Sequence, residues 1–548
     1  MAHLLFPGRH VLNTRFQEEY LLSVLSRPIS QLPLWGRGVP SAPLTEVIFA
    51  VTSSNQANSR YNPVPFHVRA IGVDRFGRRL RDALGISYRI VGIPHYGPTA
   101  NFAKNVLKEI EEQTEGELDL TPQNAVVLSS VPAVLGLFEA EGFGILGAEL
   151  ASREVPHAWS TELPFELVKR LAELGPEWAT DGELRRKLAP SAFSLFKDFP
   201  EVPKRITRLF RDPLLNEQGS LTDTRDYGTY ARAMDSIIDL KYQEIKPAIL
   251  PGRIVDEGCS DGGLLAKIAR DFPDSDFLGI DIAAEFIARG LERQRAGEFG
   301  GAFVHFHQRN LLEPIFEPGS IDTTLCNSTL HELWSYGDRE ATLSAYFAEK
   351  HRQTRPGGRL VIRDVVGFPE KDAPILMTLA AEDGANGDPF QAFASGPVLS
   401  KFLQGLSTRA RFLRFVRDFR AEQRAKGQDT DAIGYEIREV DGKEVFALRF
   451  GDAVEFLTKK DYTDNWKSEM NEEFAFWSFD EWKAAVTAAG FRVIEDATRP
   501  ERGSRVYRSE WRVANHFQGK VAFWREGADG LEPVEFPVTN LVLVAEKP

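Results

Sequence analysis

The sequence predicts an α/β protein with two Rossmann-like parallel-sheet domains joined by a helical connector, the second domain carrying an inserted lid. In two separate stretches of the chain, short apolar segments alternate with helical patterns. The stretch between them has helical periodicity without strand signals. A length of 548 residues also exceeds what one hydrophobic core usually supports, so we expect several modules.

Residues 1–175 form the first predicted domain. Its strands are expected at HLLFP, EVIFAVTSS, SYRIVGIP and NAVVLSS, with helices at QEEYLLSVL, FAKNVLKEIEEQ and VLGLFEAEGF. Because strand–helix–strand repeats join parallel strands by right-handed crossovers, this order predicts a parallel sheet. Residues 176–250 follow as the helical connector, with periodic segments at ELRRKLAPSAFSLFKDF and RDYGTYARAMDSIIDLKYQEI.

Residues 251–369 begin the second sheet domain, with strands expected at GRIVDEG, DFLGIDI, FVHFHQR, IDTTLCNST and GRLVIRDVV. Residues 370–465 break this alternation with a basic helix and with a hairpin that turns at Asp441 and Gly442. We interpret them as an inserted lid or substrate region. The second sheet domain resumes in residues 466–548, where TNLVLVAEK is the last expected strand.

Charge and cysteine content narrow the class of protein. A formal net charge of -13 argues against general nucleic-acid binding, which depends on clustered Lys and Arg. Two cysteines, Cys259 and Cys326, are too few for a disulfide scaffold or a multi-cysteine zinc site, and no metal is expected. With no signal-peptide pattern and no run of about 18 apolar residues, we expect a cytoplasmic protein that does not cross a membrane.

The strongest motif is GRIVDEGCSDGGLLAKIARDF, an apolar strand followed by a glycine-bearing turn that opens a helix. Gly258, Gly262 and Gly263 let the backbone approach a ligand and leave the helix N-terminus facing polar or anionic groups. Asp281 ends the next strand, where a carboxylate accepts both hydroxyls of a ribose. Packing alone also produces such turns, and a nicotinamide-binding domain would show the same pair.

Polar residues follow the later strands, and a Pro-Gly-Gly turn precedes the fifth. This order resembles the class I S-adenosylmethionine-dependent methyltransferases over roughly residues 225–370 and 474–548. The resemblance implies S-adenosylmethionine as the cofactor. Ser260 stands where the family commonly has glycine. The resemblance also implies these cofactor-binding residues: Asp256, Gly258, Cys259, Ser260, Gly262, Asp281, Ile282, Asn310, Leu311 and Asn327.

His331 and Glu332 are the predicted catalytic residues, because they follow the fourth strand at the methyl end of the cofactor. A sulfonium methyl group is already activated, so the protein mainly holds a nucleophile in line with it and excludes water. A base helps if the acceptor is a hydroxyl or a protonated amine. The alternative is that His331 only caps the strand and Glu332 is solvated.

The predicted acceptor is a polar or nucleotide-bearing small molecule. The residues expected to bind it lie before the first strand of the second sheet domain and after the fifth: Tyr227, Tyr230, Arg232 and Arg363. Asp364, next to Arg363, could line the same pocket. Aromatic residues at helical spacing also suit a core. The arginines of the basic helix meet an anionic acceptor on one hypothesis and form a solvated face on the other: Arg409, Arg411, Arg414, Arg417 and Arg420. The segment DYTDNWKSEMNEEFAFWSFDEW, rich in acids and aromatics, either walls a pocket or anchors the insertion.

The opening FPGRHVLNTRFQEEYLLSVL is similar to that of the nucleotidyltransferase superfamily that includes the nicotinamide-nucleotide adenylyltransferases. Gly8 and Arg9 match its Gly-Arg-Phe stretch and Thr14 its first signature position, but Phe16 replaces a glycine and Gln17 a histidine. Gln17 cannot carry the charge that stabilises a transferring phosphate, and Phe16 adds bulk. The comparison implies an inherited fold and a nucleotide pocket without nucleotidyl transfer.

Together these observations predict a methyltransferase whose first domain recognises the substrate. Two alternatives stay open. The chain is a bifunctional enzyme that also transfers a nucleotidyl group, or it is a scaffold that binds the cofactor without catalysis.

Overall fold

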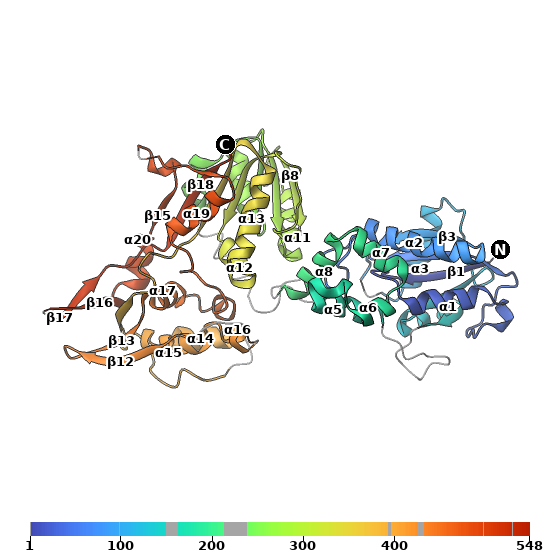
Figure 1. Ribbon diagram of the computed structural model, residues 1–548, viewed down its shortest axis with the longest axis horizontal. Helices are drawn as coiled ribbons and strands as arrows, with labels where there is room; N and C mark the ends of the chain where they lie inside the picture. The colour runs from blue at the N-terminus through green and yellow to red at the C-terminus, as the bar shows by residue number, and fades with distance from the viewer. Residues whose placement is uncertain are drawn as a thin grey trace. The chain divides into compact units, whose positions relative to one another are not determined.

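The computed structural model describes residues 2–97, 99–148, 163–212, 238–392, 396–425, 427, 432–496, 498–528 and 530–548. They fall into two compact units, Met1–Ser220 and Leu221–Pro548 (Figure 1). Within the described ranges, no helix combines the length and apolar character that crossing a bilayer requires.

A parallel sheet with the strand order β3-β2-β1-β4-β5 forms the centre of the first unit. Its strands are β1 (Ala2–Gly8), β2 (Leu44–Thr52), β3 (Ser87–Ile93), β4 (Ala125–Ser129) and β5 (Gly144–Gly147). Four helices cover its two faces and bury a separate apolar core on each. They are α1 (Arg15–Leu25), α2 (Phe66–Leu84), α3 (Phe102–Gln113) and α4 (Pro132–Ala140).

Further helices complete the first unit and change the expected domain division. They are α5 (Pro164–Leu174), α6 (Gly182–Lys187), α7 (Pro190–Asp198) and α8 (Glu201–Arg211). Leu171, Phe196 and Ile206 from these helices share one buried cluster with Val11 and Val64 of the sheet domain. The expected connector, residues 176–250, is therefore divided, because its first helices pack on the first unit and residues 238–245 form a helix of the second.

The core sheet of the second unit has the order β14-β18-β10-β9-β6-β7-β8, with β15 beside β18. Strands β6 to β10 are parallel, and β18 is antiparallel to β10. The strands are β6 (Arg253–Glu257), β7 (Asp276–Asp281), β8 (Phe303–Gln308), β9 (Ile321–Asn327), β10 (Thr354–Val365), β14 (Arg492–Val493), β15 (Arg505–Tyr507) and β18 (Asn540–Glu546). The helices are α10 (Gly263–Asp271), α11 (Ala284–Arg295), α12 (Leu330–Tyr336), α13 (Glu340–Gln353) and α19 (Phe479–Ala488). The predicted fold class is confirmed.

A separate antiparallel sheet, of order β12-β13-β11-β16-β17, builds the rest of the second unit. We call this part the antiparallel subdomain. Its strands are β11 (Pro374–Leu379), β12 (Tyr435–Val440), β13 (Lys443–Arg449), β16 (Val521–Gly527) and β17 (Gly530–Val534). Its helices are α14 (Gly396–Gly405), α15 (Thr408–Asp418), α16 (Ala421–Ala425), α17 (Phe450–Lys459), α18 (Trp466–Glu469) and α20 (Glu510–Arg512).

The hairpin predicted at Asp441 and Gly442 joins β12 to β13, and both residues have the positive φ, 53° and 71°, that a tight hairpin turn requires. The expected return of residues 466–548 to the core sheet is only partial. Strands β16 and β17 lie in that range, yet β16 pairs with β11 of the antiparallel subdomain. Figure 1 shows these red strands beside the orange hairpin. Local alternation predicts a strand but not its distant partner, which explains the difference.

Candidate functional site

The carboxyl ends of β6 and β7 place the glycine turn against Asp281. The backbone N–H groups of Gly258 and Cys259 donate to the Ile280 carbonyl at 2.8 and 3.0 Å. The N–H of Ser260 donates to Asp281 Oδ2 at 2.9 Å. The strand order reverses between β6 and β9, and at such a point open α/β sheets bind ligands. The predicted turn and the predicted ribose carboxylate thus form one connected structure at the expected edge of the sheet.

The shape of the turn depends on left-handed backbone at three positions. Gly258, Ser260 and Gly262 have φ of 74°, 49° and 78°. A Cβ on Gly258 would lie 2.3 Å from Thr329 Oγ1, so only glycine fits there. Ser260 adopts the left-handed conformation despite its side chain, a conformation that glycine adopts at no steric cost.

Two buried carboxyl groups flank the turn. Asp256 and Asp281 are 2% and 8% exposed. Burial raises the pKa of Asp256 to about 7, and the charge of Asp281 adds to the effect. Burial also raises the pKa of Asp281 to about 7, against the opposing hydrogen bonds from Ala283 and Ser260. Because a nearby cation favours the ionised form of both groups, this edge of the sheet suits a positively charged ligand.

An unsatisfied amide marks the same edge. Asn327 ends β9, and neither of its amide atoms, both buried, has a hydrogen-bond partner among the described residues. Such a group costs free energy until a partner is supplied, and the amino and carboxylate groups of an amino-acid moiety would supply one. The other predicted positions directly follow β7 and β8. Asn310 accepts from Leu312 N–H at 2.9 Å, Leu311 is buried, and the Ile282 carbonyl accepts from Gln308.

His331, on α12, lies between two buried carboxylates. Its Nδ1 is 2.6 Å from Asp364 Oδ1, and its Nε2 is 3.5 Å from Glu472 Oε2. Burial lowers the pKa of His331, but the two carboxylates outweigh burial and hold it well above its usual value. Glu332 also lies close, since its charge contributes to the raised pKa of Asp281. The structure thus brings both predicted catalytic residues to the cofactor-site residues.

Glu472 and Lys241 lie among the predicted site residues, but the sequence analysis did not single them out. Glu472 belongs to the acidic and aromatic segment after α18, in which no spacing distinguishes it from Glu469 or Glu473. Lys241 precedes β6. Burial and the Arg363 charge lower the pKa of Lys241 to about 8, whereas the charges of Asp364, Asp256 and Glu244 oppose the shift. The density of acidic residues was the only sequence signal for Glu472.

The predicted acceptor-binding residues fare differently. Arg363 is 8% exposed, its Nε lies 2.5 Å from Glu244 Oε2, and it also donates to Ser328. The role of Arg363 toward the acceptor stays a prediction. Tyr227, Tyr230 and Arg232 lie outside the described residues. The predicted basic helix ends at Asp418 as α15, so that Arg420 follows it. Each of the five arginines pairs with a carboxylate of the second unit: Arg409 with Glu444, Arg411 with Asp461, Arg414 and Arg417 with Asp418, and Arg420 with Glu473.

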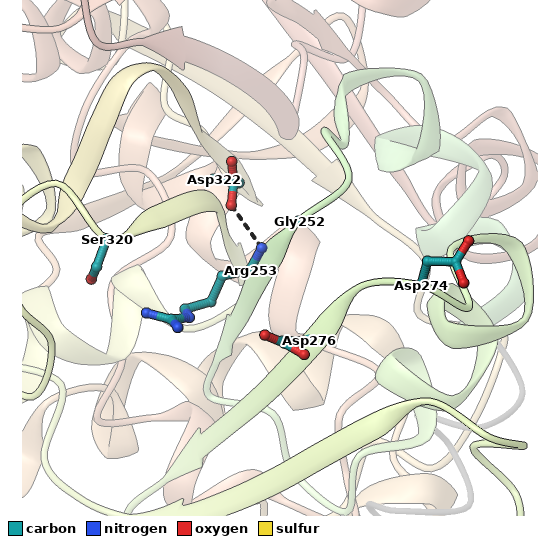
Figure 2. A pocket seen from close by; sticks show the side chains of 6 residues that line it. All are labelled: Gly252, Arg253, Asp274, Asp276, Ser320 and Asp322. Atoms are coloured by element: carbon teal, nitrogen blue, oxygen red, sulfur yellow. Dashed lines mark hydrogen bonds between the residues drawn. The ribbon is translucent and has the colours of Figure 1, made fainter.

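A hollow of about 330 Å³ lies at the opposite edge of the core sheet, near the amino ends of β6, β7 and β9 (Figure 2). Asp322 accepts a hydrogen bond from the Arg253 N–H at 2.7 Å there. The hollow is separate from the glycine turn, which follows the carboxyl end of β6. Its lining is Gly252, Arg253, Asp274, Asp276, Ser320 and Asp322.

In the first unit, Gln17 is committed to its own helix. Its Oε1 accepts from Thr14 N–H at 3.1 Å, and Thr14 Oγ1 accepts from Gln17 N–H at 3.0 Å, which forms a capping box. Phe16 stacks on Tyr20 at 5.6 Å. The side chain of Gln17 therefore caps the N-terminus of α1.

A model of a methyltransferase domain matches residues 252–392. The chain contains a methyltransferase domain. The match covers β6 to β11 and includes every predicted cofactor-binding residue.

Solved structures with low sequence identity resemble the same unit. A methyltransferase from Methanosarcina mazei is 16% identical over 55% of this chain and 96% of its own, with a TM-score of 0.27. A geranyl diphosphate C-methyltransferase from Streptomyces coelicolor is 13% identical over 59% and 82%, with a TM-score of 0.29. An S-adenosylmethionine-dependent methyltransferase from Mesorhizobium loti is 15% identical over 57% of this chain and 100% of its own, with a TM-score of 0.30. All three scores are below 0.5, so the assignment rests on the domain match and the strand order. A search of curated proteins finds no match.

Proposed function

We propose that the second unit transfers the methyl group of S-adenosylmethionine to a polar or nucleotide-bearing small molecule. The observation that carries this proposal is the connection between the glycine turn and Asp281 at the point where the strand order reverses. It lies inside the stretch that matches a methyltransferase domain. S-adenosylmethionine would supply a methyl group already activated by its sulfonium charge.

The chain's own residues have distinct tasks in this proposal. Asp281 accepts the ribose hydroxyls, Asn310 meets the adenine, and the turn at Gly258 faces the methionine part. The orphaned amide of Asn327 supports a polar ligand group beside β9. The buried carboxyls of Asp256 and Asp281 favour a cation at this edge.

His331 takes the proton of the acceptor, and Glu332 assists it on the same helix. The proposal requires a neutral imidazole, so turnover rises with pH as His331 loses its own proton. His331→Ala should lower turnover at least tenfold with little change in cofactor affinity, since general bases commonly contribute about 100-fold or more. Unaltered turnover would reject His331 as the base.

Calorimetry with S-adenosylmethionine tests the cofactor assignment directly. We expect binding to the intact chain and clear weakening in Asp281→Ala. Absence of binding, or binding that ignores this substitution, would contradict the methyltransferase proposal and leave the non-catalytic scaffold.

For the first unit we propose substrate recognition without nucleotidyl transfer. The capping box of Gln17 supports this view, because it occupies the side chain that would face the phosphate. Incubation with ATP or CTP and candidate acceptors should release no pyrophosphate. Pyrophosphate release that disappears in Arg9→Ala would instead establish the bifunctional alternative.

A further inference from the structure

We propose that Glu472 is a positioning residue for His331, so that the segment leaving the antiparallel subdomain supplies part of the acid–base apparatus at the methyltransferase site. This inference rests on the proposed function, in which His331 handles the proton of the acceptor. It assigns a role to a residue that lies outside the matched stretch 252–392.

Both nitrogens of the His331 ring face a carboxylate. Asp364, on β10, is fixed by hydrogen bonds from Thr329 and Leu330 N–H at 3.1 and 2.8 Å, and its other oxygen lies 2.6 Å from Nδ1. Glu472 lies on the opposite side, 3.5 Å from Nε2 and with a side chain only 1% exposed. The ring orientation is therefore set from two directions.

Two hydrogen bonds fix the Glu472 carboxylate through the oxygen that does not face His331. Its Oε1 accepts from Ser468 Oγ at 3.1 Å and from Tyr336 Oη at 3.3 Å. Tyr336 lies on α12, the helix that carries His331, and Ser468 lies on α18. Both the core and the antiparallel subdomain thus orient this carboxylate, and a surface glutamate would have no such anchors.

The backbone on either side of Glu472 is anchored in the same way. Glu473 N–H donates to Ser335 Oγ at 2.8 Å, and Ser335 Oγ donates to the His331 carbonyl at 2.6 Å. Phe474 N–H donates to Glu455 Oε1 at 2.7 Å, and the Phe474 ring meets the His331 ring edge-on at 5.0 Å. The segment is therefore built onto α12 at the level of the histidine.

The charges around His331 explain what this arrangement does. Asp364 faces it from β10, Glu472 from the segment after α18, and Glu332 from α12 itself. The ammonium of Lys459, on α17, lies 3.8 Å from the centre of the Phe474 ring, which in turn contacts the His331 ring. Buried carboxylates favour the imidazolium, so Glu472 sets the pH at which His331 becomes a base.

Titration of His331 by NMR, in the intact chain with ¹³C-labelled histidine, tests the inference without any substrate. The His331 signal is identified by its loss in His331→Gln. In Glu472→Gln, which keeps an oxygen for Ser468 and Tyr336, the pKa of His331 should fall by about 1 to 3 units. Glu473→Gln is the matched control, because Glu473 pairs with Trp334, Arg339 and Arg420 instead, and the pKa should not move.

The pH dependence of turnover supplies the second readout. In Glu472→Gln the rising limb of the pH–rate profile should move to lower pH by the same amount. In Glu472→Asp, which keeps the charge, the limb should stay close to its position in the parent chain. An unchanged His331 titration in folded Glu472→Gln would overturn the inference. Stoichiometric Mn²⁺ binding that is lost in Glu472→Gln would overturn it too, because a cation would then take the place of the proton. Failure of the methyltransferase proposal would appear separately, as absence of S-adenosylmethionine binding.

Discussion

Replacement of Asp281 by asparagine tests the cofactor site most sharply, because it removes a charge and keeps the shape. The carboxylate accepts backbone N–H groups from Ser260 and Ala283 at 2.9 Å each, and asparagine offers one acceptor oxygen instead of two. One charge-assisted hydrogen bond to the ribose contributes about 2 to 3 kcal/mol. We therefore expect S-adenosylmethionine to bind about 30- to 150-fold more weakly.

The affinity for S-adenosylmethionine should also depend on pH. With the pKa of Asp256 and Asp281 near 7, both carboxyls are largely protonated at pH 6, and a sulfonium ligand binds their ionised forms better. Affinity should rise with pH through 7, by about tenfold per unit for each group below its pKa. In Asp281→Asn the rise should be smaller and lie at lower pH, because Asp256 loses the like charge that raises its pKa.

Calorimetry at pH 6, 7 and 8.5 measures both effects. Asp276→Asn, at the exposed other end of β7, is the matched control and should bind like the parent chain. Cofactor affinity that is constant across this pH range, or undiminished in Asp281→Asn, would refute the assignment of the buried carboxyl to the cofactor.

Three further predictions concern stability. S-adenosylmethionine should raise the Tm of the second unit more at pH 8 than at pH 5.5, because the cationic cofactor binds the ionised forms of Asp256 and Asp281, which predominate at the higher pH. Equal shifts in calorimetric melting would contradict this. Gly258→Ala should lower the Tm more than Gly319→Ala, since both glycines have positive φ but only the first new Cβ would meet Thr329; equal losses would remove the steric argument. Gln17→Ala should destabilise the first unit by about 1 kcal/mol through loss of the capping box with Thr14, whereas Gln17→Glu should retain it, as denaturant titration can check.

The fold class was predictable because parallel strands and crossover helices leave local signals. Apolar runs marked β6, β7, β9 and β10, and the glycine turn and Asp281 follow from those strands by adjacency along the chain. The roles of the predicted site residues stay predictions, although the structure brings the described ones to one edge of the core sheet. The pairing of Arg363 with Glu244 was not predictable, because the two residues lie 119 positions apart and no pattern relates them.

Long-range placement accounts for the other differences. Glu472 meets His331 through a segment that returns from the antiparallel subdomain, and the sequence around it contains several equivalent acids. The helices α6 to α8 were predicted as part of a connector because helical periodicity does not say which apolar surface a helix covers. Partner choice of this kind is decided by tertiary packing, which a local reading cannot see.

The pairing of the last strands with much earlier ones limits how this enzyme can be divided. The chain leaves the core after β10, returns for α19, leaves again for β16 and β17, and returns as β18. Excision of residues 252–392 would therefore leave β10 without β18, and β11 without both β13 and β16. Residues 252–392 alone would expose unpaired strand edges, which favour association with other chains, so a shortened version of this unit must keep β13, β16 and β18.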